Sequence, residues 1–222
     1  MLRDAVLVAG KDLRVEGRSR VATNQVAPFA LLVLVLFAFA LDPDRGLLRR
    51  AAPGLFWLTV LFAAVLAIQR AFALEAAEGS RDALRLSGLD PGGVFVGKAA
   101  AVAVELLVLE ALLAVGVAAL YDVRLSGGVL LVTTAVVTTV GVAASGSLYG
   151  VLAAGLRGRE TLLPVLLLPV VAPVLLAATR ASEAALDGVP SDGWPWVTVL
   201  AVFAIVYTAF GIVAFGPLLE EG

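Results

Sequence analysis

The hydrophobic pattern of the chain consists of six long apolar blocks separated by shorter polar segments. Each block reaches the roughly 20 residues that an α-helix needs to cross the hydrocarbon core of a bilayer. Helices are expected because a backbone exposed to lipid must satisfy its own hydrogen bonds. The pattern predicts an all-α integral membrane bundle of six transmembrane helices, a single domain over residues 1–222, with spans at about 21–41, 52–73, 98–121, 128–153, 160–179 and 195–217.

The segment ahead of the first block has a different periodicity. Leu2, Val6 and Leu13 recur there at helical spacing, with charged residues between them. A short amphipathic helix of this kind lies in the membrane interface. We therefore predict an interface helix, or elbow, over residues 1–20, whose apolar face packs under the first spans. The mixed charges of the segment, and the length of the block that follows, argue for a retained first span rather than a cleaved signal peptide.

A polar stretch at about residues 75–97 separates the second and third spans. Ser80 can cap a short helix from Arg81 to about Leu86, and Gly88 suits the end of that helix. The Asp-Pro-Gly-Gly sequence at 90–93 is typical of a turn. This stretch is therefore predicted to be a structured cytoplasmic loop.

Composition narrows the chemistry that the chain can perform. Apolar residues make up 61% of it, and the net charge is −2, with no basic tail for nucleic acid. Histidine and cysteine are absent, and Met1 is the only methionine, so the chain offers no strong axial ligand to a haem iron. A Gly-rich phosphate loop is also missing, so any ATP hydrolysis belongs to a partner. We expect no enzyme activity, no catalytic residue, and no metal or cofactor held by this chain.

Charge and aromatic residues predict the orientation. With the N-terminus inside, 11 Lys and Arg residues fall on the inner side and 5 on the outer, with Arg45, Arg49 and Arg50 in one outer loop. The excess of inner positive charge predicts two cytoplasmic termini. Four aromatic residues fall near the outer ends of spans, where interfacial anchoring is the simplest role and contact with cargo the alternative: Trp57, Tyr121, Trp194 and Trp196.

Two carboxyl groups lie inside the third span. Glu105 and Glu110 are five residues apart, which places them on different faces of a helix. Ionised acids are costly in hydrocarbon, so intramembrane carboxyls normally face a bundle interior or a wet cavity. One interpretation is a polar wall along a substrate path. The other is a structural pairing with a polar group of a neighbouring span, or a carboxyl kept neutral by burial.

The fourth and fifth spans have unusual compositions. Small residues in the fourth span include a GxxxG spacing at Gly146 and Gly150, which predicts close helix packing. Its threonines, Thr133, Thr134, Thr138 and Thr139, can donate to carbonyls of their own helix. The fifth span carries Pro164, Pro169 and Pro173, which predict a bent helix. The bend is a candidate hinge or a static kink.

Several strings in the sequence resemble a known family, the B-type membrane component of the cytochrome c maturation haem exporter, an ABC-type permease. The resemblance covers nearly the whole chain. It rests first on the basic and acidic elbow at residues 11–18 and on the Ala-Pro-Gly-Leu-Phe-Trp string at 52–57, which opens the second span. It rests also on the acidic-Gly-Ser motif at 78–84 and on Lys98. The last feature is the basic turn into the proline-rich span, at 157–173. Arg81 and Asp82 depart from the Leu-Glu that the family usually shows there.

The resemblance implies an ABC-2-like permease fold and a set of partners. Those partners are a cytoplasmic ABC ATPase subunit, a haem-handling membrane subunit and a periplasmic haem chaperone, with ATP used by the ATPase and haem as possible cargo. The residues implied to couple to the ATPase are Glu78, Gly79, Ser80, Asp82 and Leu84. Haem could pass through the chain, or ATP hydrolysis could release the haem-loaded chaperone from the complex.

Two alternatives keep the fold and change the role. The chain could be a permease for a lipid, drug or polysaccharide, which a deletion that spares c-type cytochromes would reveal. It could also be a scaffold that only assembles a haem-ligation complex. Normal cytochrome c maturation with an ATPase partner unable to hydrolyse ATP would favour the scaffold.

Overall fold

The computed structural model describes residues 1–19, 26–41, 45–77, 88–121, 127–154 and 159–221. These residues form an all-helical protein, as the hydrophobic blocks predict. The elements are α1 (Leu2–Ser19), α2 (Ala27–Leu41), α3 (Arg45–Ala77), α5 (Pro91–Leu120), α6 (Gly128–Ala154), α7 (Arg159–Leu186), a short 3-10 helix η2 (Pro190–Gly193) and α8 (Trp194–Glu221).

Five of the helices are long and apolar enough to cross a membrane. Their apolar spans run over Gly46–Phe72, Pro91–Leu120, Gly128–Ala153, Leu162–Leu186 and Pro190–Leu218. The predicted first span contains α2, which has 15 residues. At about 1.5 Å per residue this helix rises only about 22 Å, less than the roughly 30 Å of a hydrocarbon core. The described residues therefore contain five long apolar helices and one shorter one.

The third span begins earlier than the hydrophobic pattern indicates. Asp90 caps α5, because its side chain accepts a hydrogen bond of 2.7 Å from the backbone N–H of Gly93. Pro91 takes the first helical position, where its missing N–H costs nothing. The predicted turn at 90–93 is thus wrong, because an aspartate followed by proline starts a helix here as effectively as it could start a turn.

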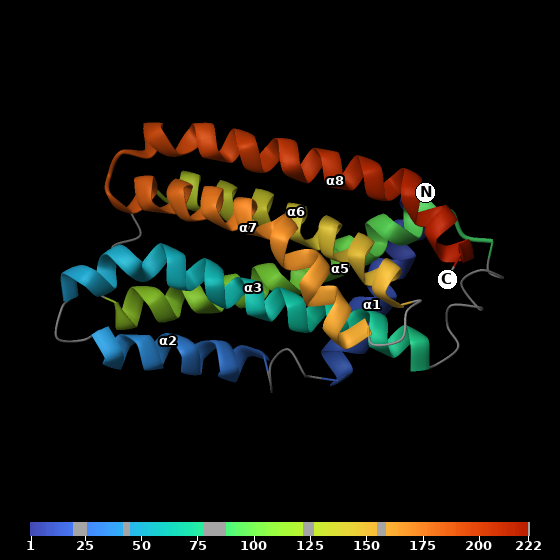
Figure 1. Cartoon of the computed structure of the whole chain (residues 1–222), viewed down its shortest axis with the longest axis horizontal. Coiled ribbons are helices and arrows are strands. Elements are labelled where there is room, and N and C mark those ends of the chain that lie inside the picture. Colours follow the sequence, from blue (N-terminus) through green and yellow to red (C-terminus); the bar gives the residue numbers. More distant parts are fainter. Residues whose placement is uncertain (20–25, 42–44, 78–87, 122–126, 155–158, 222) are drawn as a thin grey trace.

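The predicted outer loop with three arginines is also wrong in its conformation. The helix α3 begins at Arg45, so Arg49 and Arg50 lie in its first two turns rather than in a loop. Pro53 follows within the same helix. The start of α3, which carries the three arginines, lies at the end of the bundle opposite the two termini (Figure 1).

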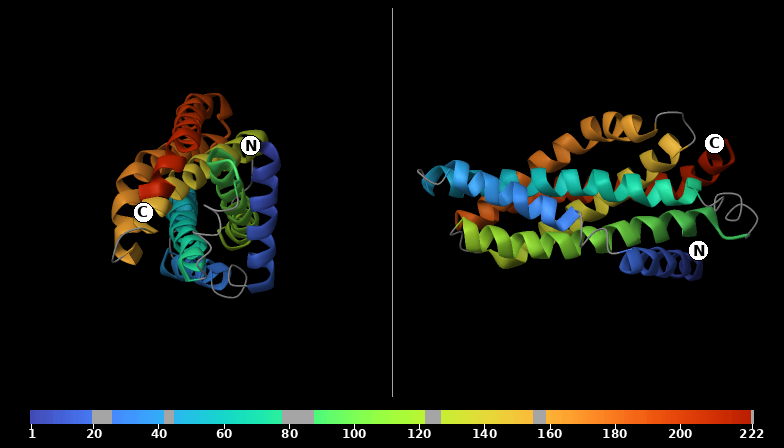
Figure 2. Two further views of the ribbon diagram at one scale, coloured as in Figure 1. Left: turned by 90° about the vertical axis from the view of Figure 1, so that its right-hand side faces the viewer. Right: turned by 90° about the horizontal axis from the view of Figure 1, so that it is seen from below.

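The helices from α2 to α8 run along the long axis of the molecule, and α1 lies across one end (Figures 1 and 2). The helix α6 is central, because it packs against α3, α5, α7 and α8. Gly146 and Gly150 face Ile68 and Phe72 of α3, and a Cβ at either glycine would overlap those side chains. The GxxxG spacing therefore serves close packing, as predicted from the sequence.

The surface of the bundle is apolar along its length. On α8, Ile205 is 68% exposed and Val213 is 76% exposed, and on α5 Val108 is 69% exposed. Large apolar side chains in such number are rare on the surface of a water-soluble monomer. These helices are built to face lipid.

Candidate functional site

The interface helix α1 packs closely on the first turns of α5. Ala5 and Val8 are buried at this contact, with 7% and 4% of their surfaces exposed. Gly93 and Gly97 of α5, four residues apart, make the close approach possible. A Cβ on Gly97 would lie 2.6 Å from the carbonyl oxygen of Ala5, nearer than side chains are found in proteins.

This contact corrects the predicted apolar face of the elbow. Leu2 is 81% exposed and Val6 is 72% exposed, whereas Leu13 is half-buried and the smaller residues Ala5 and Val8 face the bundle. The helix therefore has two apolar faces, and the larger side chains point away from the protein. Arg3, Arg14 and Arg18 lie on α1 as well, and all three are exposed. An outward face of leucine, valine and arginine suits a membrane interface with anionic lipid.

Two acidic side chains of α1 point in the opposite direction, toward the spans. Asp12 lies 3.5 Å from the Nζ of Lys98 on α5, and Glu16 lies 3.2 Å from the Nε of Arg70 on α3. Only 4% of the Lys98 side chain is exposed, and its Nζ lies 5.3 Å from the centre of the Phe72 ring. A buried lysine needs such partners, because an uncompensated buried charge costs several kcal/mol. The two ion pairs tie α1 to both α3 and α5.

A third contact ties the start of α1 to the start of α5. The backbone N–H of Asp90 donates a 3.3 Å hydrogen bond to the carboxylate of Asp4. This donor is the main reason that the pKa of Asp4 lies below its usual value. We call the three contacts, made by Asp4, Asp12 and Glu16, the elbow clamp.

The residues proposed to couple to the ATPase lie outside the described residues. Glu78, Gly79, Ser80, Asp82 and Leu84 all fall in the interval between α3 and α5. The elbow clamp holds the two helices that lead into and out of this interval, at Arg70 on one side and Asp90 and Lys98 on the other. The elbow clamp therefore joins α1 to the helices on both sides of this interval.

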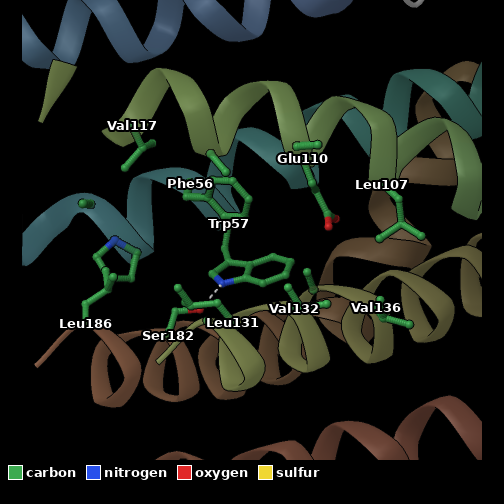
Figure 3. A pocket seen from close by; sticks show the side chains of 16 residues that line it. Phe56, Trp57, Leu107, Glu110, Val117, Leu131, Val132, Val136, Ser182 and Leu186 are labelled. Carbon is green, nitrogen blue, oxygen red and sulfur yellow. Dashed lines mark hydrogen bonds between the residues drawn. The ribbon is translucent and has the colours of Figure 1, made fainter. Parts of the chain in front are cut away.

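A second candidate site is a slot of about 360 Å³ between α3, α5, α6 and α7. Its walls are almost entirely apolar, and include Phe56, Leu107, Val117, Val132 and Val136 (Figure 3). Glu110 of α5 points into it from one side, and Trp57 of α3 lies across it. The slot therefore combines apolar walls with a carboxyl group.

Glu110 is only 3% exposed. Its Oε1 accepts a hydrogen bond of 2.5 Å from the hydroxyl of Thr139 on α6, whereas its Oε2 is buried and has no hydrogen-bond partner among the described residues. The predicted pairing with a polar group of a neighbouring span is therefore found at Oε1 of Glu110. At Oε2 it is not found among the described residues. Glu105 lies elsewhere, half-buried and within electrostatic reach of Glu16 and Arg70. The two acids therefore do not form a joint site.

The threonines of α6 behave differently from the prediction. Thr133 donates to the carbonyl of Val129 in its own helix, as expected. Thr139 donates to Glu110 instead, and the hydroxyls of Thr134 and Thr138 are buried without a hydrogen-bond partner in the part of the chain that the structure describes. The prediction was wrong for these three, because a hydrophobic sequence does not show which hydroxyls meet a neighbouring helix.

Two of the predicted interfacial aromatics are part of the core. Trp57 is 2% exposed, and its indole N–H donates a 3.0 Å hydrogen bond to the hydroxyl of Ser182 on α7. Tyr121 is 2% exposed and donates to the carbonyl of Leu34 on α2. Trp194 and Trp196, at the start of α8, are 43% and 37% exposed and fit the interfacial role. No local pattern in the chain indicates the pairing of Trp57 with Ser182.

The proline-rich span forms one helix, α7, with Pro164, Pro169 and Pro173 inside it. Its axis turns along its length, as Figures 1 and 2 show. Each proline removes a backbone donor from the helix, which accounts for the bend. The described residues include no group of three or more side chains that could hold a metal ion.

The helices and their apolar surface define a multi-pass membrane protein. The family model of the CcmB protein matches residues 3–220, and the chain therefore belongs to the CcmB family. It is 32% identical over 196 residues to heme exporter protein B of Bradyrhizobium diazoefficiens, covering 87% of each chain. It is also 30% identical to heme exporter protein B of Haemophilus influenzae, covering 84% of this chain and 85% of that one. Heme exporter protein B of Escherichia coli K12 is 32% identical over 191 residues, covering 82% of this chain and 83% of that one.

Proposed function

We propose that this chain is the permease subunit of a haem exporter that acts in cytochrome c maturation, in the cytoplasmic membrane of a bacterium. The observation that carries the proposal is the match to the CcmB family over residues 3–220, together with relatives named heme exporter protein B. The long apolar helices support the membrane location. The chain would act with a separate ATPase subunit, because its sequence has no phosphate loop of its own.

We propose six spans, with α2 and the residues before it as the first. The N- and C-termini lie at the same end of the bundle, which requires an even number of crossings if α1 stays in the interface (Figure 1). The distribution of lysine and arginine then favours two cytoplasmic termini. An ABC-2-like fold with a cytoplasmic elbow agrees with this topology.

The interval between α3 and α5 is the proposed contact with the ATPase. Within it, Ser80 and Leu84 are proposed as the helix cap and the apolar contact. Closure of an ATPase pair would push on this interval, and the elbow clamp would carry the movement to α1, α3 and α5 at once. The bent helix α7, with Pro164, Pro169 and Pro173, would absorb the resulting tilt.

The work done by the permease is proposed to be mechanical. The chain has no histidine, no cysteine and no methionine beyond Met1 to ligate haem iron strongly. A haem-handling membrane subunit would therefore hold the haem, and ATP hydrolysis would release the loaded periplasmic chaperone. Passage of haem through this chain is the competing mechanism within the same function.

Purification from native membranes tests this proposal. The protein, tagged after α8 and extracted in mild detergent, is expected to bring with it an ATPase subunit and a membrane protein whose haem absorbance is visible in the eluate. A tagged, unrelated multi-pass protein from the same membranes serves as the control. Recovery of the chain with neither partner would contradict the proposal.

A further inference from the structure

The slot beside Glu110 has the geometry of a ligand site that the proposed function does not use. It runs along α5 from Leu107 to Val117, a separation of ten positions, which at about 1.5 Å per residue is about 15 Å. Gly128 and Leu186, which line its far end, are the first residue of α6 and the last of α7. The slot therefore extends from the end of the bundle opposite the two termini to the depth of Glu110.

The polar groups of the slot are satisfied except at one atom. The Trp57 indole donates to Ser182, and the Ser182 hydroxyl donates to the carbonyl of Ala178. The Oε1 of Glu110 accepts from Thr139. Among the described residues that line the slot, the Oε2 of Glu110, on a side chain that is 3% exposed, is the one polar side-chain atom without a partner.

The surroundings favour the uncharged form of Glu110. None of the described residues that line the slot is cationic. An ionised carboxylate in such a place would carry the full cost of a buried charge, whereas the neutral acid carries a much smaller one. Because Thr139 donates to Oε1, the proton belongs on Oε2, whose O–H then points into the slot as a free donor.

We propose that the slot binds an uncharged lipophilic carbonyl compound from the bilayer, whose carbonyl oxygen accepts a hydrogen bond from Glu110. A carbonyl accepts without bringing a donor that would need a second partner. The apolar walls suit a hydrocarbon ring or chain attached to the carbonyl group. Phe56 and Trp57, packed edge to face with their ring centres 5.2 Å apart, offer an aromatic surface. A charged molecule would find no counter-charge among the described lining residues.

Trp57 reports on this slot directly. Trp194 and Trp196 can be replaced by phenylalanine, because both are exposed at the start of α8, leaving Trp57 as the only tryptophan. The full-length Trp194→Phe/Trp196→Phe protein in lipid nanodiscs is titrated with menadione, an uncharged quinone, and quenching of Trp57 is recorded. Parallel titrations use dibrominated stearic acid, which also quenches indole, and protoporphyrin.

The expected result is saturable quenching by menadione. Glu110→Gln retains an N–H donor and should bind within a few-fold of the parent, whereas Glu110→Leu should bind about tenfold more weakly or only by linear partition. Glu105→Leu, on another face of the same helix, should bind as the parent does. Thermal midpoints of all variants show that each is folded.

Three results would overturn the proposal. Equal saturable binding by Glu110→Leu would show that the carboxyl is not involved. Loss of binding in Glu110→Gln would show that an ionised carboxylate is required. Saturable binding of protoporphyrin or of the fatty acid, with menadione inactive, would assign the slot to cargo or to a lipid chain instead. None of these results depends on the ATPase partner, so the site and the proposed function fail separately.

Discussion

Lys98 and Glu110 lie on the same helix, α5, and are accommodated in different ways. The Nζ of Lys98 lies 3.5 Å from the carboxylate of Asp12 on α1 and 5.3 Å from the centre of the Phe72 ring. Glu110, in an apolar slot, has a hydroxyl as its one hydrogen-bond partner among the described residues. At the level of single residues, the first group fixes the interface helix and the second creates a place for a ligand.

Removing the carboxylate beside Lys98 should destabilise the protein. Asp12→Leu leaves the buried ammonium without that counter-charge and is expected to cost about 3 kcal/mol, seen as a lower thermal midpoint in detergent. The double variant Asp12→Leu/Lys98→Met should recover most of the loss, because both charges are gone. Lys11→Ala, which breaks a more exposed pair with Asp12, should change little. A double variant less stable than Asp12→Leu alone would be inconsistent with the ion pair.

At the level of elements, the contact between α1 and α5 depends on the absence of side chains. Gly93 and Gly97 allow the backbone of α1 to approach the backbone of α5, so the interface helix packs directly against a span. The exposed leucine and valine of α1 then face outward, toward lipid. The protein thus fixes one side of the elbow, and the other side is apolar and exposed, as an interface helix requires.

Gly97→Ala should push α1 away from α5. Its new Cβ would meet the carbonyl of Ala5 at 2.6 Å, so limited proteolysis within α1 should become faster. Gly10→Ala is the matched control, because nothing lies within 4 Å of its Cβ and alanine favours a helix by up to about 1 kcal/mol. Equal protection of α1 in both variants would argue against the close contact.

The interval between α3 and α5 carries the coupling prediction. Leu84→Asp should weaken ATPase association and lower the amount of assembled c-type cytochrome, since a charge would replace the proposed apolar contact. Val189→Asp, at an exposed turn at the other end of the bundle, should leave both unchanged. The coupling role is wrong if Leu84→Asp behaves like this control.

The prolines of α7 give a separate prediction. Pro169→Ala restores a backbone donor and should straighten and stiffen the helix. If α7 is a hinge, cytochrome c assembly should fall while co-purification with the ATPase is retained. Unchanged assembly would make the bend a static kink.

At the level of the whole molecule, helix positions followed from hydropathy because long apolar blocks must form helices in lipid. Hydropathy did not show which face of each helix is buried, since a helix that is apolar all round has no apolar stripe that marks its buried side. Trp57 therefore appeared to be an interfacial anchor and Leu2 a packed residue, although burial shows the reverse. The slot at Glu110 was hidden for the same reason, because its walls come from four helices.

The proposed six-span topology agrees with the two termini lying at one end of the bundle (Figure 1). The central position of α6, in contact with α3, α5, α7 and α8, means that movement of the elbow and its two helices is transmitted through a packed core. The proposed push at the end of the bundle that carries the termini would reach the spans through this core. This is the mechanical role that the proposed function requires.

The most direct test is the amount of covalently bound haem in c-type cytochromes of a strain that lacks this chain. Membranes are separated by denaturing electrophoresis and stained for haem, with and without a plasmid copy of the wild-type sequence. The account predicts that the haem-stained bands are lost on deletion and restored by the plasmid. Retention of these bands in the deletion strain would contradict a role in cytochrome c maturation.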